Sequence, residues 1–271
     1  MKLTLAQLRV QAADLTENRR RAVAAIERAA ADGADLVVLP ELFTVGYFAF
    51  EAYARSAEGL DGETMTELQS VAADNDVAVL AGSFVEELSH SARAGHDVPA
   101  EDGLANTAVF LDRDGKRRAV YRKHHLFGYS SEEAERLVPG RRLPTVEFEG
   151  FTVGVTTCYD LRFPELYRRL VDDGVTLTVV PSAWPYPRVE HWRLLPRARA
   201  VENQMYVAAA NGVGSFETAE LLGRSAVYDP WGTTVAGAND DDGLVTATVD
   251  PERVTAVREE FPTLADRRID R

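Results

Sequence analysis

Helical and strand-like patterns alternate along most of the 271-residue chain. After an opening strand-like run, residues 14–32 repeat apolar side chains at helical spacing and lead into the short apolar run DLVVLP. The same order recurs in PELYRRLVDDG followed by TLTVVP, and in VEHWRLLPRARAVEN followed by MYVAAAN. Short apolar strands between helices are typical of α/β proteins. The chain is therefore predicted to be an α/β protein.

Three hairpin patterns lie between these units. They are NTAVFLDRDGKRRAVYRK, which turns at Asp114-Gly115, then TVEFEGFTVGVTTC, and SAVYDPWGTTVAGA, which turns at residues 229–232. Residues 89–103 are polar and without periodicity, so a loop is expected there. Because no interdomain linker interrupts the pattern, residues 1–271 are predicted to form a single domain.

The cysteine count and the charge exclude several classes of protein. A single cysteine excludes an intrachain disulfide framework and a cysteine-rich zinc site, and it indicates a cytoplasmic protein. The net charge of -13 argues against sequence-independent binding to nucleic acid or anionic lipid. No run approaches the roughly 18 apolar residues of a membrane span, and MKLTLAQLRV alternates like a strand rather than a secretory signal. Neither nucleic acid nor a membrane is expected as a partner.

Three reactive side chains directly follow strand-like runs. Glu41 comes after DLVVLP, Lys123 ends the returning strand of the first hairpin, and Cys158 ends TVEFEGFTVGVTTC. Ligands of α/β sheets collect beyond the carboxyl ends of strands, where loops present side chains from a rigid support. The alternatives without a catalytic role are a helix-start or turn carboxylate for Glu41 and a solvated charge on an edge strand for Lys123. The sequence has only three lysines, which weakens that interpretation for Lys123.

A single cysteine is more often a buried structural thiol than a nucleophile, but these three side chains suit thiol attack on an amide. A thiol attacks as thiolate, although at a pKa of about 8.5 it is mostly protonated near neutrality. Glu41 has apolar neighbours, and burial among them would raise its pKa and make it a better base. Attack creates an oxyanion, which Lys123 and the backbone N–H of Tyr159 are expected to stabilise.

The segments LVVLPE, YRKHHLF and TTCYDLRFPE resemble the three signature segments of the nitrilase superfamily, the carbon-nitrogen hydrolases with a Glu-Lys-Cys catalytic set. HWRLLPRARAVENQMYVAAAN and YDPWG are also similar to family segments, so the resemblance covers nearly the whole chain. It implies Cys158 as nucleophile, Glu41 as general base and acid, and Lys123 as stabiliser of the tetrahedral intermediate. It also implies a four-layer α-β-β-α sandwich with mixed sheets.

The same resemblance implies a fourth catalytic residue and an oligomer. Many members carry a glutamate shortly before PG that holds the lysine and the substrate, and EEAERLVPG places Glu133 at that offset, with Glu132 and Glu135 as alternatives. Members commonly pair through two helices, which here correspond to residues 164–174 and 189–203. A homodimer or a higher homo-oligomer is therefore expected.

Four further residues are candidates for substrate binding: Tyr159 and Arg162 follow Cys158, and Tyr47 and Trp184 follow other strand ends. Tyr47 and Trp184 either line the pocket or belong to the core. For Arg162 an ion pair with Asp160 or Glu165 is the preferred interpretation, and binding of a substrate carboxylate is the other.

His124 and His125 invite a Cys-His hydrolase interpretation, but the resemblance puts the chemistry on the neighbouring Lys123, so they are interpreted as supporting or surface residues. No cluster of His, Asp and Glu has metal-binding spacing, and neither a metal nor a cofactor is expected.

These observations predict a thiol amidohydrolase that forms an acyl-enzyme, releases ammonia or an amine, and uses water to release a carboxylic acid. CYDLRFPEL, PSAW, RARAVENQMYV and DPWGTTVA are most similar to the branch that holds ω-amidases and deaminated-glutathione amidases. The implied substrate is the ω-amide of a small carboxylic or 2-oxo acid. Hydrolysis of N-carbamoyl compounds, acyl transfer to an amine, and a catalytically silent interaction module on the same fold are the alternatives.

Overall fold

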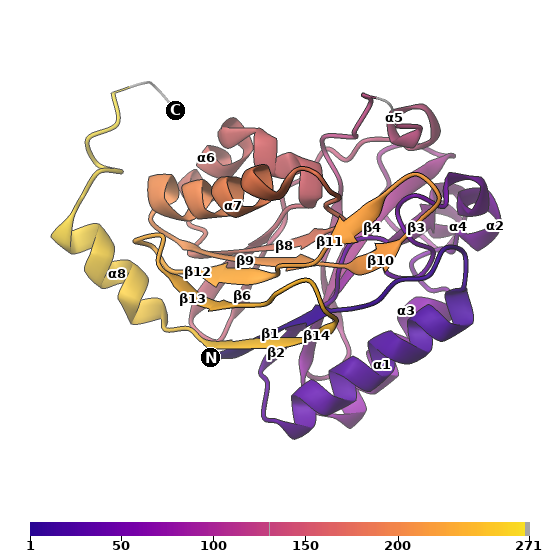
Figure 1. Cartoon of the computed structure of the whole chain (residues 1–271), viewed down its shortest axis with the longest axis horizontal. Helices are drawn as coiled ribbons and strands as arrows, with labels where there is room; N and C mark the ends of the chain where they lie inside the picture. The colour runs from indigo at the N-terminus through magenta and orange to yellow at the C-terminus, as the bar shows by residue number, and fades with distance from the viewer. Residues whose placement is uncertain (130, 269–271) are drawn as a thin grey trace.

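The computed structural model describes residues 1–129 and 131–268. Two six-stranded sheets lie face to face (Figure 1). The first sheet contains, in spatial order, β14 (Gly243–Thr248), β1 (Lys2–Gln7), β2 (Leu36–Val38), β3 (Ala78–Glu87), β4 (Leu104–Leu111) and β5 (Arg117–Arg122). The second contains β13 (Thr234–Gly237), β12 (Ala226–Tyr228), β9 (Tyr206–Asn211), β8 (Leu177–Ser182), β7 (Phe151–Val155) and β6 (Thr145–Phe148). A separate hairpin pairs β10 (Val213–Ser215) with β11 (Glu220–Leu222).

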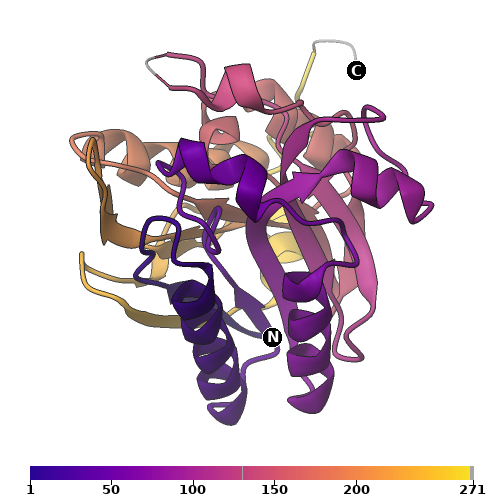
Figure 2. The same ribbon diagram turned by 90° about the vertical axis from the view of Figure 1, so that its right-hand side faces the viewer.

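Helices cover the outer face of each sheet. Apolar side chains of α1 (Leu15–Ala31) and α3 (Glu63–Asp74) pack against the first sheet, and Figure 2 shows these two helices next to each other. Side chains of α6 (Pro164–Asp172) and α7 (Val189–Asn203) pack against the second. The remaining helical segments are η1 (Phe50–Ala52), α2 (Tyr53–Ser56), α4 (Leu88–Arg93), α5 (Glu133–Arg136), η2 (Cys158–Arg162) and α8 (Pro251–Glu260).

The main hydrophobic core lies between the two sheets. It joins Leu3 and Val38 of the first sheet to Val153 and Val179 of the second, all at most 2% exposed. In each sheet three central strands run parallel, β1-β2-β3 and β7-β8-β9, and the flanking strands are antiparallel. The predicted four-layer α-β-β-α sandwich with mixed sheets is therefore confirmed.

Most expected elements are present, but the structure also differs from the expectations. The three hairpins form as β4-β5, β6-β7 and β12-β13, and Asp14 caps α1 by accepting a hydrogen bond from the backbone N–H of Glu17 at 3.2 Å. The loop predicted for residues 89–103 is wrong at its start, because Leu88–Arg93 form α4 with Leu88 and Ser91 buried. The hairpin β10-β11 was not expected at all.

The carboxyl ends of both sheets' parallel strands meet at one place. The backbone N–H of Glu41, just beyond β2, donates to the carbonyl of Ser182 at the end of β8 at 3.3 Å. Gly82 of β3 permits this course of the chain, because a Cβ there would lie 1.9 Å from the carbonyl oxygen of Leu39. Loops from the two sheets are thus brought together at one end of the sandwich. In the described residues, no helix has the length and apolar character to cross a membrane.

Candidate active site

Two strand ends and one short helix bring Glu41, Lys123 and Glu133 into one buried cluster. Lys123 directly follows β5, and its Nζ lies 2.8 Å from Oε1 of Glu41. The same Nζ donates to both oxygens of Glu133, at 2.8 and 2.9 Å. All three side chains have no exposed surface. One ammonium therefore lies between two carboxylates, out of contact with bulk water.

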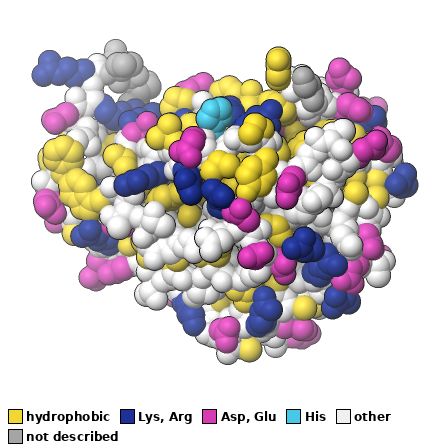
Figure 3. Space-filling model, in the orientation of Figure 1, with side chains coloured by type: hydrophobic (Ala, Val, Ile, Leu, Met, Phe, Trp, Pro, Cys, Tyr) yellow, Lys and Arg dark blue, Asp and Glu magenta, His cyan; other side chains and the backbone are white. Residues whose placement is uncertain are grey.

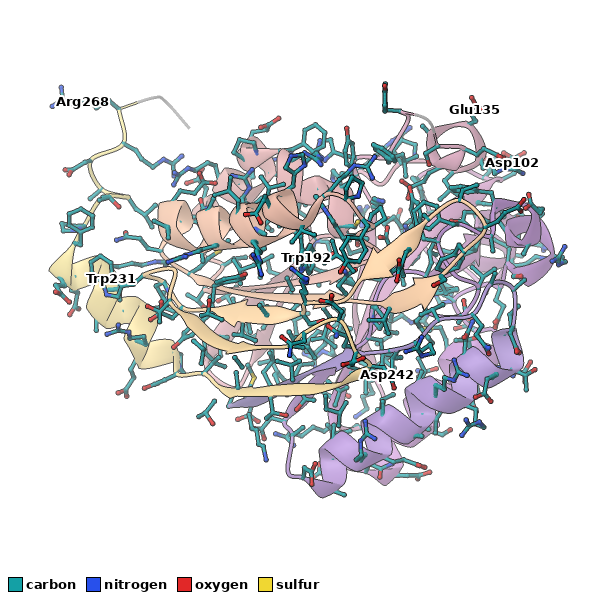
Figure 4. All side chains as sticks on the ribbon, viewed as in Figure 1. Asp102, Glu135, Trp192, Trp231, Asp242 and Arg268 are labelled. Carbon is teal, nitrogen blue, oxygen red and sulfur yellow. The ribbon has the colours of Figure 1, made fainter. Side chains whose placement is uncertain are left out.

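The short helix α5 supplies Glu133 to this cluster, and the two neighbouring candidates lie elsewhere. Glu132 pairs with Arg136, and Glu135 is exposed and points outward from the helix (Figure 4). Gly140 closes the segment against β5, because its N–H donates to the carbonyl of Lys123 at 2.9 Å and a Cβ there would lie 2.0 Å from the carbonyl oxygen of Arg122.

Further donors fix the two carboxylates. The backbone N–H of Ala183 donates to Oε2 of Glu41 at 2.9 Å. Glu133 accepts from the hydroxyl of Tyr47 at 3.0 Å and from the backbone N–H of Phe127 at 2.7 Å. Both glutamates are thus held in one orientation by groups on several loops.

Cys158 begins the 3-10 turn η2 in a conformation that non-glycine residues rarely adopt. Its φ is +47°, in the left-handed region. The turn is held by Asp160, whose carboxylate accepts from the backbone N–H of Thr157 at 2.9 Å and from the hydroxyl of Tyr121 at 2.6 Å. Backbone strain of this kind persists when the surroundings enforce it, and it concentrates at functional sites. The turn directs the Cys158 side chain, 8% exposed as a residue, into a cavity.

Burial and charge shift the pKa values of Cys158, Glu41 and Lys123. Burial, together with the charge of Glu41, raises the pKa of the Cys158 thiol well above its ordinary value. Burial also raises the pKa of Glu41, with Lys123 opposing the shift. For Lys123 burial alone would lower the pKa, but the charges of Glu133 and Glu41 outweigh it and hold the pKa well above the usual range. The arrangement therefore keeps a cation, a thiol and a carboxylate of raised basicity together.

A cavity of about 300 Å³ opens above Cys158 and Lys123. The four residues expected to bind substrate all line it: Tyr47, Tyr159, Arg162 and Trp184. Tyr47 and Trp184 are 4% and 3% exposed, so they are at once core and wall residues. Most of the remaining wall is aromatic or proline, which favours a small ligand with apolar carbons and few polar groups.

The preferred interpretation of Arg162 as an ion pair within its own turn is wrong. Asp160 points inward and is occupied by the donors that hold the turn, including Nδ1 of His125 at 2.8 Å. Arg162 instead lies in the cavity wall, with its guanidinium 5.0 Å from the centre of the Trp184 ring. Within the described residues, its closest polar partner is Nδ1 of His191 at 3.1 Å, and no carboxylate lies within ion-pair distance.

The two histidines after Lys123 do not line the cavity. His124 stacks on Tyr121, and His125 stacks on Phe163 at 3.6 Å between ring centres and pairs with Asp160. Both pack behind the nucleophile turn. Within residues 1–129 and 131–268, no group of three or more His, Cys, Asp or Glu side chains is arranged to hold a metal ion.

Two residues of the site escaped the sequence analysis. Asn106 on β4 donates from Nδ2 to Oε1 of Glu41 at 2.9 Å and to Oε1 of Glu133 at 3.1 Å. A signal existed, because Asn106 shares a strand face with the core residues Ala108 and Phe110, and a polar residue on a core face is unusual. Arg188, at the start of α7, lines the cavity and lies over the ring of Phe127. No local pattern marks it.

Comparison with known proteins places these observations in a family. Residues 2–259 match the model of the carbon-nitrogen hydrolase family. A 2-oxoglutaramate amidase of Paenarthrobacter nicotinovorans is 39% identical over 241 residues, which cover 88% of this chain and 79% of the relative. A deaminated glutathione amidase of Synechocystis is 35% identical over 267 residues, covering 94% and 93% of the two chains.

The fold agrees with this relationship. The crystal structure of Nit3 from Saccharomyces cerevisiae, described as a member of branch 10 of the nitrilase superfamily, superposes with a TM-score of 0.88 at 31% identity. The match covers 99% of this chain and 97% of Nit3. The chain belongs to the carbon-nitrogen hydrolase family, within the nitrilase superfamily that its three sequence segments resemble.

Proposed function

We propose that the protein is a cysteine-dependent amidohydrolase of small ω-amides, with Cys158 as nucleophile, Glu41 as general base and acid, and Lys123 and Glu133 as supporting catalytic residues. The observation that carries the proposal is the buried contact of Glu41, Lys123 and Glu133 beside the Cys158 thiol at the floor of one cavity. A binding module has no need for a buried ammonium between two carboxylates, because removing these groups from water costs free energy.

The first half of the reaction follows from this geometry. Glu41 takes the thiol proton as the sulfur of Cys158 bonds to the amide carbon, and the carbonyl π electrons move to oxygen. The ammonium of Lys123 and a backbone N–H, such as that of Tyr159, stabilise the oxyanion. Glu41 then gives its proton to the departing nitrogen, and the C–N bond breaks. Ammonia departs, and the acyl group stays bound to Cys158 as a thioester.

The second half returns the enzyme to its starting state. Water attacks the thioester carbon and gives a proton to Glu41. Collapse of the tetrahedral intermediate breaks the C–S bond, and Glu41 returns the proton to the sulfur. The product acid gives up its remaining proton to solvent and leaves as a carboxylate. Lys123 serves both oxyanions, and Glu133 keeps the ammonium in place throughout.

Two arginines support an anionic substrate. Arg162 and Arg188 both line the cavity, and in the described parts of the chain neither lies within ion-pair distance of a carboxylate. Both guanidiniums rest on aromatic rings of the wall, and apart from the Arg162 nitrogen that contacts His191, their N–H groups are left for a ligand. A carboxylate at the far end of an ω-amide would satisfy them, and relatives include a 2-oxoglutaramate amidase and omega-amidases.

A substrate panel tests this function. Release of ammonia would be measured with ω-amides of 2-oxo and simple dicarboxylic acids, N-carbamoyl amino acids, neutral aliphatic amides and nitriles, for the unchanged protein and for Cys158→Ala. The ω-amides should react fastest, and the variant should be inactive. Equal ammonia release by Cys158→Ala would overturn the mechanism, and a preference for N-carbamoyl compounds would overturn the substrate class.

The proposal extends to the assembly. We infer a single cytoplasmic domain that forms a homodimer through α6 and α7. Its support is the apolar surface of α7, where Leu194 and Val201 are 63% and 48% exposed. On the face shown in Figure 3, acidic and basic side chains are interspersed with hydrophobic ones, so no extended basic surface for nucleic acid is visible there.

A further inference from the structure

Asn106, on β4, forms hydrogen bonds to three residues of the buried cluster: Glu41, Glu133 and Lys123. Its side chain donates to Glu41 and to Glu133, at 2.9 and 3.1 Å. Its backbone carbonyl accepts from the N–H of Lys123 at 2.9 Å. Asn106 is itself 1% exposed. One residue of β4 thus joins three residues that arrive from β2, β5 and α5.

The charges of the cluster explain what this bridge does. Two carboxylates share the single ammonium of Lys123, so their mutual repulsion is not fully offset. The Nδ2 group of Asn106 offers each carboxylate one of its two hydrogens without adding charge. Oε1 of Glu41 therefore accepts from Lys123 and Asn106, while Oε2 accepts from Ala183. Both Glu41 oxygens are restrained, and the carboxylate cannot rotate freely.

We propose that Asn106 is a positioning residue, which holds the carboxylate of Glu41 in the orientation needed to exchange a proton with Cys158 and keeps Glu133 beside it. The inference rests on the proposed function, in which Glu41 is the base. Asn106 acts through Glu41 and has no place in the cavity wall.

The unpartnered end of the side chain favours this role over a purely structural one. Oδ1 of Asn106 is buried and has no hydrogen-bond partner among the described residues. A buried acceptor without a hydrogen-bond partner lowers the stability of the fold. If Asn106 served stability alone, we would expect both its N–H groups and its carbonyl oxygen to have hydrogen-bond partners. Here the donor end is fully used on the two carboxylates, and the acceptor end has no hydrogen-bond partner among the described residues.

The variant Asn106→Leu removes both donors while keeping the branched outline of the side chain. The groups that face Glu41 would otherwise stay in place, namely Lys123, Glu133, Cys158 and Tyr47. A carboxylate that loses a donor to its charged form is protonated more readily. The acid limb of kcat/KM should therefore move to higher pH by about one unit, with a loss of roughly 10²-fold in kcat and a small change in KM.

Thr107→Val is the matched control on the same strand. Thr107 is equally buried but faces the other side of β4, where its hydroxyl donates to Glu86 at 2.6 Å. The control also removes a buried hydrogen bond to a carboxylate, so it should lower stability while leaving the pH profile of kcat/KM unchanged. A purely structural role for Asn106 would make the two variants behave alike.

Asn106→Asp provides a second variant if Asn106→Leu does not fold. It keeps the shape but replaces the donor by a third acidic group, so the acid limb should again move to higher pH. An unchanged pH profile and kcat in either folded variant would overturn the inference. Its failure is distinguishable from failure of the proposed function, because the unchanged protein would still hydrolyse an ω-amide and Cys158→Ala would not.

Discussion

Lys123 carries one positive charge between two carboxylates in a fully buried cluster. Replacing it by Met would leave Glu41 and Glu133 without their counter-ion. Breaking a buried ion pair by removal of one partner costs about 3–5 kcal/mol of folding free energy. We therefore expect Lys123→Met to lower the urea midpoint markedly and to abolish ammonia release.

A control separates the two effects. Arg122, the last residue of β5, forms an equally close ion pair with Glu86, at 2.7 Å between Nε and Oε2. Arg122 does not line the cavity above Cys158. Arg122→Met should destabilise the protein in a similar way but leave kcat measurable in the folded fraction. Full activity of Lys123→Met would contradict the role proposed for the ammonium.

The raised pKa of Glu41 predicts the acid side of the pH profile. Burial shifts this pKa above 4.5, so the base is protonated, and activity is lost, at a higher pH than for an exposed glutamate. The glutamine side chain of Glu41→Gln cannot accept a proton. This variant should lose nearly all activity, and its remaining activity should show no acid limb. A kcat/KM profile that stays flat down to pH values below the ordinary glutamate pKa would contradict Glu41 as the base.

Arg162 and Arg188 predict a dependence on substrate charge. Loss of a hydrogen bond to a charged group costs roughly 1.5–3 kcal/mol, which corresponds to an increase of about 10- to 100-fold in KM. Arg162→Leu and Arg188→Leu should show this increase with an anionic ω-amide but not with a neutral amide of equal length. Arg193→Leu, on the outer, exposed part of α7, is the control and should change neither. Equal effects on both substrates would indicate a structural role.

At the scale of the element, the turn η2 depends on Asp160 more than on local propensity. Asp160→Ala removes the acceptor of Thr157, Tyr121 and His125 at once. Loss of a capping acceptor costs about 1–2 kcal/mol, and here it should also release Cys158 from its left-handed conformation.

Asp14→Ala is the matched control, because Asp14 caps α1 far from the cavity. Both variants should lower the thermal midpoint, Asp160→Ala by more because it leaves several buried donors without their acceptor, but only Asp160→Ala should lower kcat. Equal kcat values after correction for the folded fraction would show that the turn does not need this anchor.

The elements that sequence patterns predicted are those that local physics decides. Periodicity, the Asp14 cap and the Asp114-Gly115 turn act over a few residues, and α1 and β4-β5 follow them. The pairing of β1 with β14 joins residues from opposite ends of the sequence. The helix α4 is held by two buried side chains rather than by a helical pattern. Neither leaves a local signal.

The same distinction holds for the site. Glu41, Lys123 and Cys158 could be selected because each follows a strand, and strand ends converge in α/β folds. Asn106 left only the signal of a polar residue on a core strand face, and Arg188 left none, because their roles depend on which loops and strands meet in space. The orientation of Arg162 was missed for a related reason: Asp160 is taken up by Tyr121, which is distant in sequence.

At the scale of the whole molecule, the exposed apolar side chains predict a dimer. Leu194 and Val201 lie exposed on α7, and a second copy would cover them. Sedimentation should give twice the 29.8 kDa mass of one chain, and Leu194→Glu should shift it to the monomer. Val235→Glu, on β13 and also 41% exposed, is the control. A monomeric unchanged protein would contradict the assembly.

The covalent intermediate gives the most direct test of the account. The protein would be mixed with an ω-amide, quenched in acid within milliseconds to seconds, and measured by intact mass and peptide mapping. The account predicts an added mass equal to the substrate minus ammonia, located on the peptide that contains Cys158 and removed by hydroxylamine. Steady ammonia release without any such adduct, or with the adduct on another residue, would contradict it.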